Sequence, residues 1–179
     1  MSAVVSDVAA SIRAKARDDE RLRAEAAREQ ADQISDAIEA TRRRLDEGAT
    51  LLMFGNGGSA TDANDWAIDC VSPPPEAAPI RALSLSAEPA HITAIANDIG
   101  TDAVFLRQLI AHARPGDVAM RKRKLLTLAL LGYDGGEIVR RGLADLPIVV
   151  RCDYIPRIQE VQASIYHVMT EAWQHLRRG

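Results

Sequence analysis

The sequence has no run of about 18 apolar residues, and it does not begin with the basic and then apolar segments of a secretory signal. It also lacks a basic excess, because 22 Lys and Arg stand against 25 Asp and Glu. The net charge of −3 argues against a general nucleic-acid-binding protein. Only two cysteines occur, Cys70 and Cys152, and their separation is not that of a metal site. We therefore expect a cytoplasmic protein with reduced thiols that binds neither membranes nor nucleic acid.

The length of 179 residues and the hydrophobic fraction of 47% predict one domain with one sizeable core. Residues 6–47 contain neither Gly nor Pro and are rich in helix-forming residues, so this segment is predicted to be helical. Asp18 and Asp19 could cap a second helix and divide the segment in two. Because its apolar stripe is narrow and rich in Ala, we interpret residues 1–48 as an oligomer contact.

A strand, a glycine-rich loop and a helix are predicted in succession between Thr50 and Asp69. The strand is the apolar run 50–54. Gly55, Asn56, Gly57, Gly58 and Ser59 follow it, and we call these five residues the glycine loop. Such a loop bends sharply and directs backbone N–H groups at an anion at the start of the next helix, so it suits a phosphate.

The same loop has the spacing of a dinucleotide-binding turn, with Gly55, Gly57 and Ala60 in the required places. A dinucleotide site also needs an acidic residue about 20 positions further on, at the end of the second strand. The second predicted strand, 80–85, has no carboxylate at its end. A nicotinamide-dependent oxidoreductase is therefore the weaker hypothesis.

Two predicted helices carry polar side chains that suit a site. The helix after the loop places Asp62, Asp65 and Asp69 on one face, which in an arbitrary helix is a solvated acidic face but here starts beside a phosphate-type loop. The helix predicted over 155–178 carries Gln159 and His167, which are roughly 80° apart around its axis and can face one cavity. A single His beside apolar neighbours is more often structural, and that interpretation stays open.

Two of the strands predicted after residue 88 lie too close together in the sequence. Helices are predicted over 88–96, 104–113 and 136–143, and strands over 117–120, 125–131 and 148–150. Only the basic residues 121–124 separate the first two of these strands, whereas parallel neighbours need a crossover of a dozen or more residues. We infer that a loop and helix are missing between residues 120 and 121, or that the topology changes there. A nucleic-acid signal is a poorer explanation for so short a run in an acidic protein.

Five short motifs together resemble the sugar isomerase (SIS) domain family over nearly the whole chain. They are the glycine loop, Asn97-Asp98, Arg114-Pro115-Gly116-Asp117-Val118, Asp134-Gly135-Gly136 and Arg157-Ile158-Gln159-Glu160. The resemblance implies an α/β fold, a flavodoxin-like three-layer αβα sandwich with a five-stranded parallel sheet and N-terminal helices. It further implies a homotetramer whose active sites lie at subunit interfaces.

The resemblance also implies one divalent metal per subunit, commonly zinc. Its ligands would be Asp65, Asp69, Gln159 and His167. Gln159 and His167 match the family, whereas Asp65 replaces the usual His and Asp69 the usual Glu. A set richer in oxygen shifts the preference toward harder metals such as manganese or magnesium. The shorter Asp69 would also draw a catalytic base back from the substrate.

The implied reaction is the conversion of D-sedoheptulose 7-phosphate into D-glycero-D-manno-heptose 7-phosphate through an enediol, in heptose biosynthesis. Asp69 would be the general base and His167 the acid, while the metal polarises the carbonyl. The expected substrate-binding residues are Asn56, Gly57, Gly58, Ser59, Asn97, Asp98, Asp69 and Gln159. The second phosphate loop of the family, expected directly after 117–120, has no counterpart in this sequence.

A non-catalytic regulator of the same family is the alternative. Such members bind a protein partner such as the replication initiator, and their metal and catalytic positions are degraded. Asp65, in place of the usual His, favours this alternative. Gln159 and His167 favour the enzyme, because a scaffold has no need of them.

Overall fold

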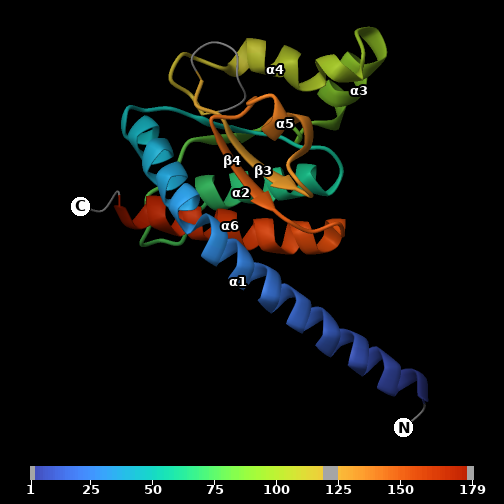
Figure 1. Cartoon of the computed structure of the whole chain (residues 1–179). Coiled ribbons are helices and arrows are strands. Elements are labelled where there is room, and N and C mark those ends of the chain that lie inside the picture. The colour runs from blue at the N-terminus through green and yellow to red at the C-terminus, as the bar shows by residue number, and fades with distance from the viewer. Residues whose placement is uncertain (1–2, 119–124, 177–179) are drawn as a thin grey trace.

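The computed structural model describes residues 3–118 and 125–176 (Figure 1). The chain begins with one continuous helix of 44 residues, α1 (Ala3–Asp46). The prediction of a break at Asp18 and Asp19, and so of more than one N-terminal helix, is wrong. Asp19 does not cap a helix but lies in an ion pair with Arg157 of the last helix, with 3.3 Å between Nε and Oδ1. The helix ends before Gly48, whose φ of +87° favours glycine.

Parallel strands form the centre of the molecule. β1 (Leu51–Met53) pairs with β2 (Ala82–Ser84), and β3 (Leu128–Gly132) pairs with β4 (Leu146–Val150). Val118 joins the two pairs through single parallel bridges, to Leu51 on one side and to Leu126 on the other. The α/β class and the parallel direction are confirmed. In the described residues, however, the expected five-stranded sheet consists of two two-stranded sheets and this bridging residue.

Two buried polar anchors hold the bridging segments. The Asp117 carboxylate accepts hydrogen bonds from the backbone N–H groups of Thr50, at 2.8 Å, and Arg114, at 2.7 Å. On the other side of Val118, the buried Thr127 exchanges hydrogen bonds with Asp145, including one of 2.7 Å from the Asp145 N–H to Thr127 Oγ1. The Arg-Pro-Gly-Asp motif thus positions a strand start. The expected missing segment falls on residues 119–124, outside the described residues.

Helices lie on both sides of the strands (Figure 1). On one side, α2 (Gly58–Val71) lies beside α6 (Ile155–Leu176), and α1 crosses α6. The other helices are α3 (Pro89–Asp98), the short 3₁₀ helix η1 (Thr101–Ala103), α4 (Val104–His112) and α5 (Gly136–Arg140). The main core lies between α6 and the strands, and its most deeply buried side chains include Trp173, Met169, Val161, Ile148, Val150 and Ile80.

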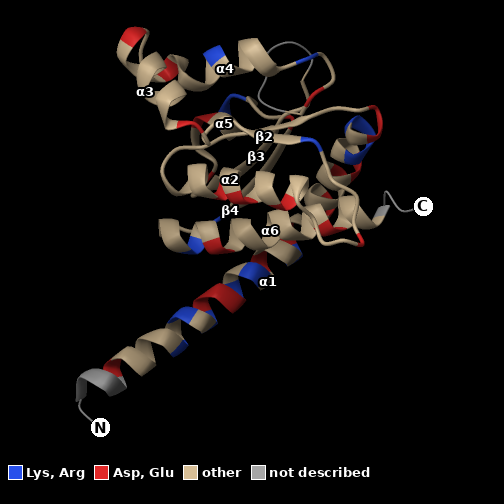
Figure 2. Ribbon diagram, turned by 180° about the vertical axis from the view of Figure 1, so that it is seen from behind, with Lys and Arg blue, Asp and Glu red and all other residues tan. Residues whose placement is uncertain are grey.

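The N-terminal part of α1 extends away from the body of the protein (Figure 1). Val8 and Ile12 there are 55% and 63% exposed. Charges of both signs alternate along the helix without a long run of either (Figure 2). None of the helices in the described ranges is both long and apolar enough to cross a membrane.

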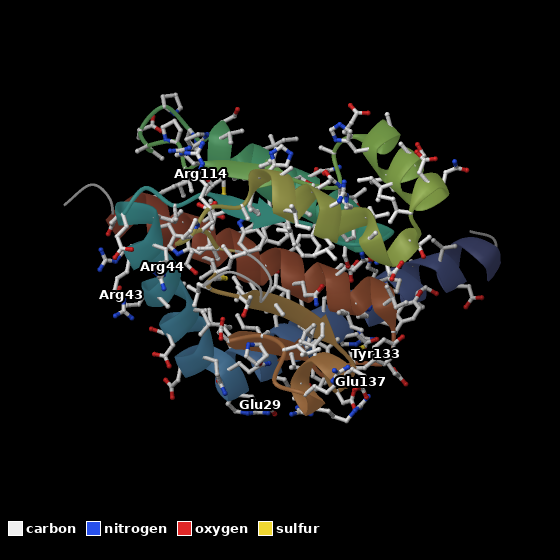
Figure 3. The ribbon with its side chains drawn as sticks, turned by 90° about the horizontal axis from the view of Figure 1, so that it is seen from above. Glu29, Arg43, Arg44, Arg114, Tyr133 and Glu137 are labelled. Atoms are coloured by element: carbon white, nitrogen blue, oxygen red, sulfur yellow. The ribbon has the colours of Figure 1, made fainter. Side chains whose placement is uncertain are left out.

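Because the strands are parallel, their carboxyl ends lie at the same edge. The glycine loop follows β1 there, and Tyr133 and Glu137 lie just after β3. Arg43, Arg44 and Arg114, which precede strand starts in the sequence, lie toward the opposite end of the molecule (Figure 3). The edge that carries the glycine loop is where ligands bind in open parallel sheets.

Candidate functional site

The glycine loop makes a tight turn between β1 and α2. A Cβ on Gly55 would lie 2.5 Å from the backbone oxygen of Ser59, so only glycine fits at this position. The backbone N–H of Ser59 donates to the carbonyl of Asn56 at 3.1 Å, and Gly57, with φ of +57°, precedes the helix. The predicted loop that opens a helix is therefore confirmed.

A cavity of about 500 Å³ lies between the two strand pairs, next to this loop. Its polar lining comes from Asn56 and Ser59 of the loop, Asp62 of α2, and Tyr166 of α6 together with Gln162. Its apolar lining includes Leu52, Phe54, Trp66, Phe105, Leu130 and Trp173. The loop and both helices that carry the predicted site thus border one space.

Aromatic packing fixes α2 against α6. Trp66 of α2 stacks on Tyr166 and Trp173 of α6, with ring centroids 5.2 and 5.9 Å apart. The Trp66 indole N–H donates to Thr170 Oγ1 at 2.8 Å. Stacked aromatic side chains with a satisfied N–H hold two helices in one relative position. This packing sets the distances between the polar residues that the two helices carry.

The acidic face of α2 meets α6 at two points. Asp69 Oδ2 lies 3.4 Å from His167 Nε2, and the two side chains are 45% and 52% exposed. Nearer the loop, Gln159 Nε2 donates to Asp62 Oδ2 at 3.5 Å. Asp65, one turn along from Asp62, is exposed. The structure therefore brings Asp69 to His167, but it brings Gln159 to Asp62.

Two other predicted residues lie elsewhere. Asn97 and Asp98 form the exposed end of α3, where the Asn97 amide donates to Asp98 Oδ1 at 2.7 Å. Neither residue lines the cavity beside the glycine loop. Asp98 instead lines a shallow groove of about 390 Å³ between α3 and α4, together with His91, Arg107 and His112. The structure does not bring the Asn-Asp motif to the loop.

Comparison with known proteins identifies the family. The SIS domain profile matches residues 16–121, more than half of the chain, and this part includes the loop and all of α2. The chain belongs to the SIS domain family. The resemblance inferred from the motifs is confirmed.

Three proteins compared with this SIS domain chain are named phosphoheptose isomerase. The chain is 35% identical to the phosphoheptose isomerase of Geobacter sulfurreducens, over 94% of this chain and 96% of that protein. It is 38% identical to the phosphoheptose isomerase of Pelobacter propionicus, over 79% and 82% of the two chains. The solved phosphoheptose isomerase of Neisseria gonorrhoeae has a TM-score of 0.83 to it at 27% identity, covering 93% of this chain and 98% of that one.

The comparisons also show a difference in length between this chain and a relative. The alignment with the Geobacter sulfurreducens protein spans 187 positions, more than the 179 residues of this chain. That relative therefore has positions without a counterpart here. The SIS domain match itself ends at residue 121.

The electrostatics of the SIS domain site reflect burial and an excess of carboxylates. Burial raises the pKa of Asp62, and the charge of Asp65 raises it further, while the hydrogen bond from Gln159 opposes both. Burial, together with the charges of Asp62, Asp65 and Asp69, raises the pKa of Tyr166 to about 12. The phenol therefore stays neutral at physiological pH and remains a hydrogen-bond donor.

The two cysteines take no part in this site. Both are free thiols, as expected. Burial raises the pKa of Cys70 to about 12, against a hydrogen bond with Thr170 that lowers it. Because the thiolate is the form that attacks electrophiles and binds metals, Cys70 is a packing residue.

The donor set expected for a metal does not assemble. Among the described residues, no group of three or more His, Cys, Asp and Glu side chains lies close enough to hold a metal ion. Only Asp69 and His167 are adjacent, and Gln159 is engaged by Asp62. The side chains as placed do not fit the expected metal.

Sequence reasoning gave no role to two residues of the site, Asp62 and Tyr166. Asp62 was noted only as the first of three aspartates on one helix face, although its place three residues after Ser59 of the glycine loop was a usable signal. Tyr166 was missed because no motif contains it. Its position next to His167 on a helix that faces α2 becomes informative only once the packing is known.

Proposed function

We propose that this chain is a phosphoheptose isomerase that converts D-sedoheptulose 7-phosphate into D-glycero-D-manno-heptose 7-phosphate through an enediol. One observation carries the proposal. A carboxylate and an imidazole, Asp69 of α2 and His167 of α6, lie 3.4 Å apart, and α2 starts at a phosphate-type loop, in a chain that is 35% identical over nearly its whole length to a phosphoheptose isomerase. Both side chains are about half exposed and so accessible to a sugar.

The glycine loop is the proposed anchor of the substrate. Gly57 and Gly58 lie at the start of α2, where backbone N–H groups and the helix dipole favour an anion. Asn56 and Ser59 line the cavity and would bind the phosphate or the hydroxyl groups. The assignment of Asn97 and Asp98 to the same substrate rests on the family resemblance alone.

The isomerisation needs one base and one acid. Asp69 takes a proton from carbon 1 of the ketose, and the electrons of that C–H bond form the double bond between carbons 1 and 2. His167 protonates the carbonyl oxygen on carbon 2, which completes the enediol. Return of a proton to carbon 2, with loss of the proton from the oxygen on carbon 1, yields the aldose. General acid and base groups of this kind contribute about 10²- to 10⁴-fold to the rate.

The proposal includes a divalent metal, zinc or another, as a separate part. Its ligands would be Asp65, Asp69, Gln159 and His167. In the arrangement described above, only two of these are adjacent, so the steps above are assigned to side chains alone. A metal would supply electrostatic stabilisation of the enediolate once bound.

A homotetramer is the proposed assembly, with α1 as a contact. The support is the projecting N-terminal part of this helix, where Val8 and Ile12 remain exposed in the single chain. Light scattering coupled to size-exclusion chromatography measures the assembly. A monomeric mass would contradict this part of the proposal.

The second candidate is a regulator that lacks catalysis and binds a protein such as the replication initiator. The observations in its favour are Asp65, which stands where the family resemblance implies a His, and the positions of the Geobacter sulfurreducens relative that have no counterpart in this chain. We propose that one loop and helix present in that relative are missing at the junction of residues 120 and 121. A phosphate would then depend on the glycine loop alone.

The deciding experiment is turnover of sedoheptulose 7-phosphate. The protein is first stripped of metal with a chelator and then assayed alone, with zinc and with manganese, beside Asp69→Asn. Turnover that Asp69→Asn lowers by about 10²-fold or more establishes an isomerase with its base on α2. The dependence on added metal decides the cofactor separately. A folded protein without turnover in any of these conditions contradicts the isomerase and supports the regulator.

A further inference from the structure

We propose that Asp62 is a positioning residue, which holds the side-chain amide of Gln159 so that its oxygen is presented to the sugar. This inference rests on the isomerase proposed above. Gln159 was expected to contact substrate or metal directly, and Asp62 had no expected role. The structure joins the two residues across 97 positions of sequence.

The Gln159 amide lies between two features of α2. Its Nε2 is 3.5 Å from Asp62 Oδ2. On another side it lies against Gly58, where an added Cβ would be only 1.9 Å from Nε2 and 2.8 Å from Oε1. The first residue of α2, Gly58, must therefore be glycine for the amide to occupy this place. The amide consequently lies against the proposed phosphate anchor itself.

The chemistry of a carboxylate determines which end of the amide faces it. An ionised carboxylate only accepts hydrogen bonds, so it selects the NH₂ end of Gln159 and turns the oxygen away. Within the described residues, the Gln159 side chain makes no other hydrogen bond. Its oxygen is thus left as an acceptor for a sugar hydroxyl. Without Asp62, the two ends of the amide could exchange places.

Asp62 has no better structural explanation. It is partly buried and lines the cavity with Asn56 and Ser59, although a carboxylate is normally exposed or paired with a cation. Among the described residues it forms no ion pair with Lys or Arg. A negative charge beside a phosphate loop also weakens anion binding. Within the described ranges, the hydrogen bond to Gln159 is the one polar side-chain contact found for this carboxylate.

A double-mutant cycle tests the coupling. Asp62→Asn, Gln159→Ala and the double variant are compared with the parent protein for kcat and KM. Asn keeps the volume of Asp62, but its side-chain amide can either accept or donate a hydrogen bond. It therefore no longer selects one end of the Gln159 amide. We expect Asp62→Asn to raise KM about tenfold with a smaller change in kcat. In the Gln159→Ala background the same change should have no further effect.

The controls separate this role from charge and from folding. Asp36→Asn removes the same charge from an exposed position of α1 and should leave KM unchanged. Gly58→Ala leaves the charge in place but displaces the amide, and should raise KM without adding to Asp62→Asn. An equal KM increase in both Gln159 backgrounds, or an unchanged KM in Asp62→Asn, would overturn the proposal.

A readout that needs no turnover separates the two proposals. The side-chain NH₂ signal of Gln159, identified by its loss in Gln159→Ala, is followed by NMR in protein labelled with ¹⁵N-glutamine. We expect Asp62→Asn to shift this signal and Asp36→Asn to leave it in place. If the parent protein shows no turnover, the isomerase fails, while the shift still reports the contact. An unchanged signal in Asp62→Asn overturns the positioning role in either case.

Discussion

The two sides of α6 make contacts of different kinds. Toward α1, the Trp173 indole N–H donates to the carbonyl of Ile38 at 3.0 Å, and Arg157 and Asp19 pair while only 14% and 15% exposed. Toward the acidic face of α2, the polar contacts are 3.4 and 3.5 Å long, and the Asp69 and His167 side chains are about half exposed. The first side is built as a structural contact. The second leaves its polar groups free to exchange partners with a ligand.

The charged groups on the two sides of α6 differ in the same sense. Facing α1, Glu160 of α6 pairs with Lys15, and Arg157 pairs with both Asp19 and Glu160, so opposite charges are matched. On α2, Asp62, Asp65 and Asp69 face one imidazole and one amide, an excess of carboxylates that stability alone does not favour. Carboxylates that lower stability by repelling one another are typical of functional sites.

The largest effect that would test this difference between the two sides of α6 is expected from removing the His167 imidazole. We expect His167→Gln to lower kcat about 10²- to 10⁴-fold, because the acid of the proposed reaction is lost. The free energy of unfolding should change by less than about 0.5 kcal/mol, because the contact with Asp69 is half exposed. Steady-state kinetics and urea unfolding measure the two quantities. His175→Gln, at an exposed position of the same helix, is the matched control.

A second prediction concerns Trp173, which is fully buried and belongs to both sides. We expect Trp173→Ala to lower the free energy of unfolding by about 3–5 kcal/mol, through loss of packing and of the hydrogen bond to Ile38. Trp173→Phe, which keeps an aromatic ring, should cost about 1 kcal/mol. Denaturant unfolding followed by the fluorescence of Trp66 reports both variants. A loss below 1 kcal/mol for Trp173→Ala would contradict the packing described here.

How much of this was predictable depends on the range of the interaction. The glycine loop and its helix were predicted because Gly55 and Ser59 determine that turn between themselves. A strand was predicted over residues 117–120, yet the pairing of this segment depends on strands far away in the sequence. In the described residues, only Val118 of this segment bridges to Leu51 and Leu126. The continuous α1 was missed because Asp19 finds its partner 138 positions later in Arg157.

In the candidate site, too, local features were predicted and long-range contacts were not. Helical periodicity correctly placed the aspartates of α2 on one face, and it identified Gln159 and His167 as candidates. It could not say which aspartate meets which partner, because that depends on how the aromatic packing of Trp66 sets one helix against the other. Asp69 meets His167 as expected, whereas Asp62, and not Asp65, meets Gln159.

A third prediction tests how α1 is fixed to the edge strand. The side-chain amide of Gln30 accepts from the backbone N–H of Val149 at 2.7 Å and donates to the carbonyl of the same residue, as a neighbouring strand would. We expect Gln30→Ala to lower the free energy of unfolding by about 1–3 kcal/mol, because two backbone groups of β4 lose their partner. Gln33→Ala, at an exposed position of α1, should cost less than about 0.5 kcal/mol. Equal losses for both would contradict this role.

The smallest expected effect belongs to Glu160, at the charged end of the contact with α1. Burial raises the pKa of Glu160, but hydrogen bonds from Lys15, Asp19 and Arg157 outweigh it and bring the pKa to about 2. A pKa below the ordinary value of 4.5 means that the ionised form stabilises the fold. This contribution is fully present above about pH 4.5 and is lost as the pH falls toward 2. Burial and the neighbouring Glu160 raise the pKa of Asp19, so this carboxyl has the opposite sign and partly offsets the loss.

We therefore expect Glu160→Gln to lower the free energy of unfolding at pH 7 by about 1 kcal/mol or less, because the Glu160 side chain is 28% exposed and solvent screens its ion pairs. The variant should also lose less stability than the parent between pH 4.5 and pH 2, since it has no charge there to neutralise. Urea unfolding across this pH range measures both effects. Parallel curves for the two proteins would show that the Glu160 charge contributes nothing to the contact between α6 and α1. Its stability would then come from Trp173, the Arg157–Asp19 ion pair and the apolar packing.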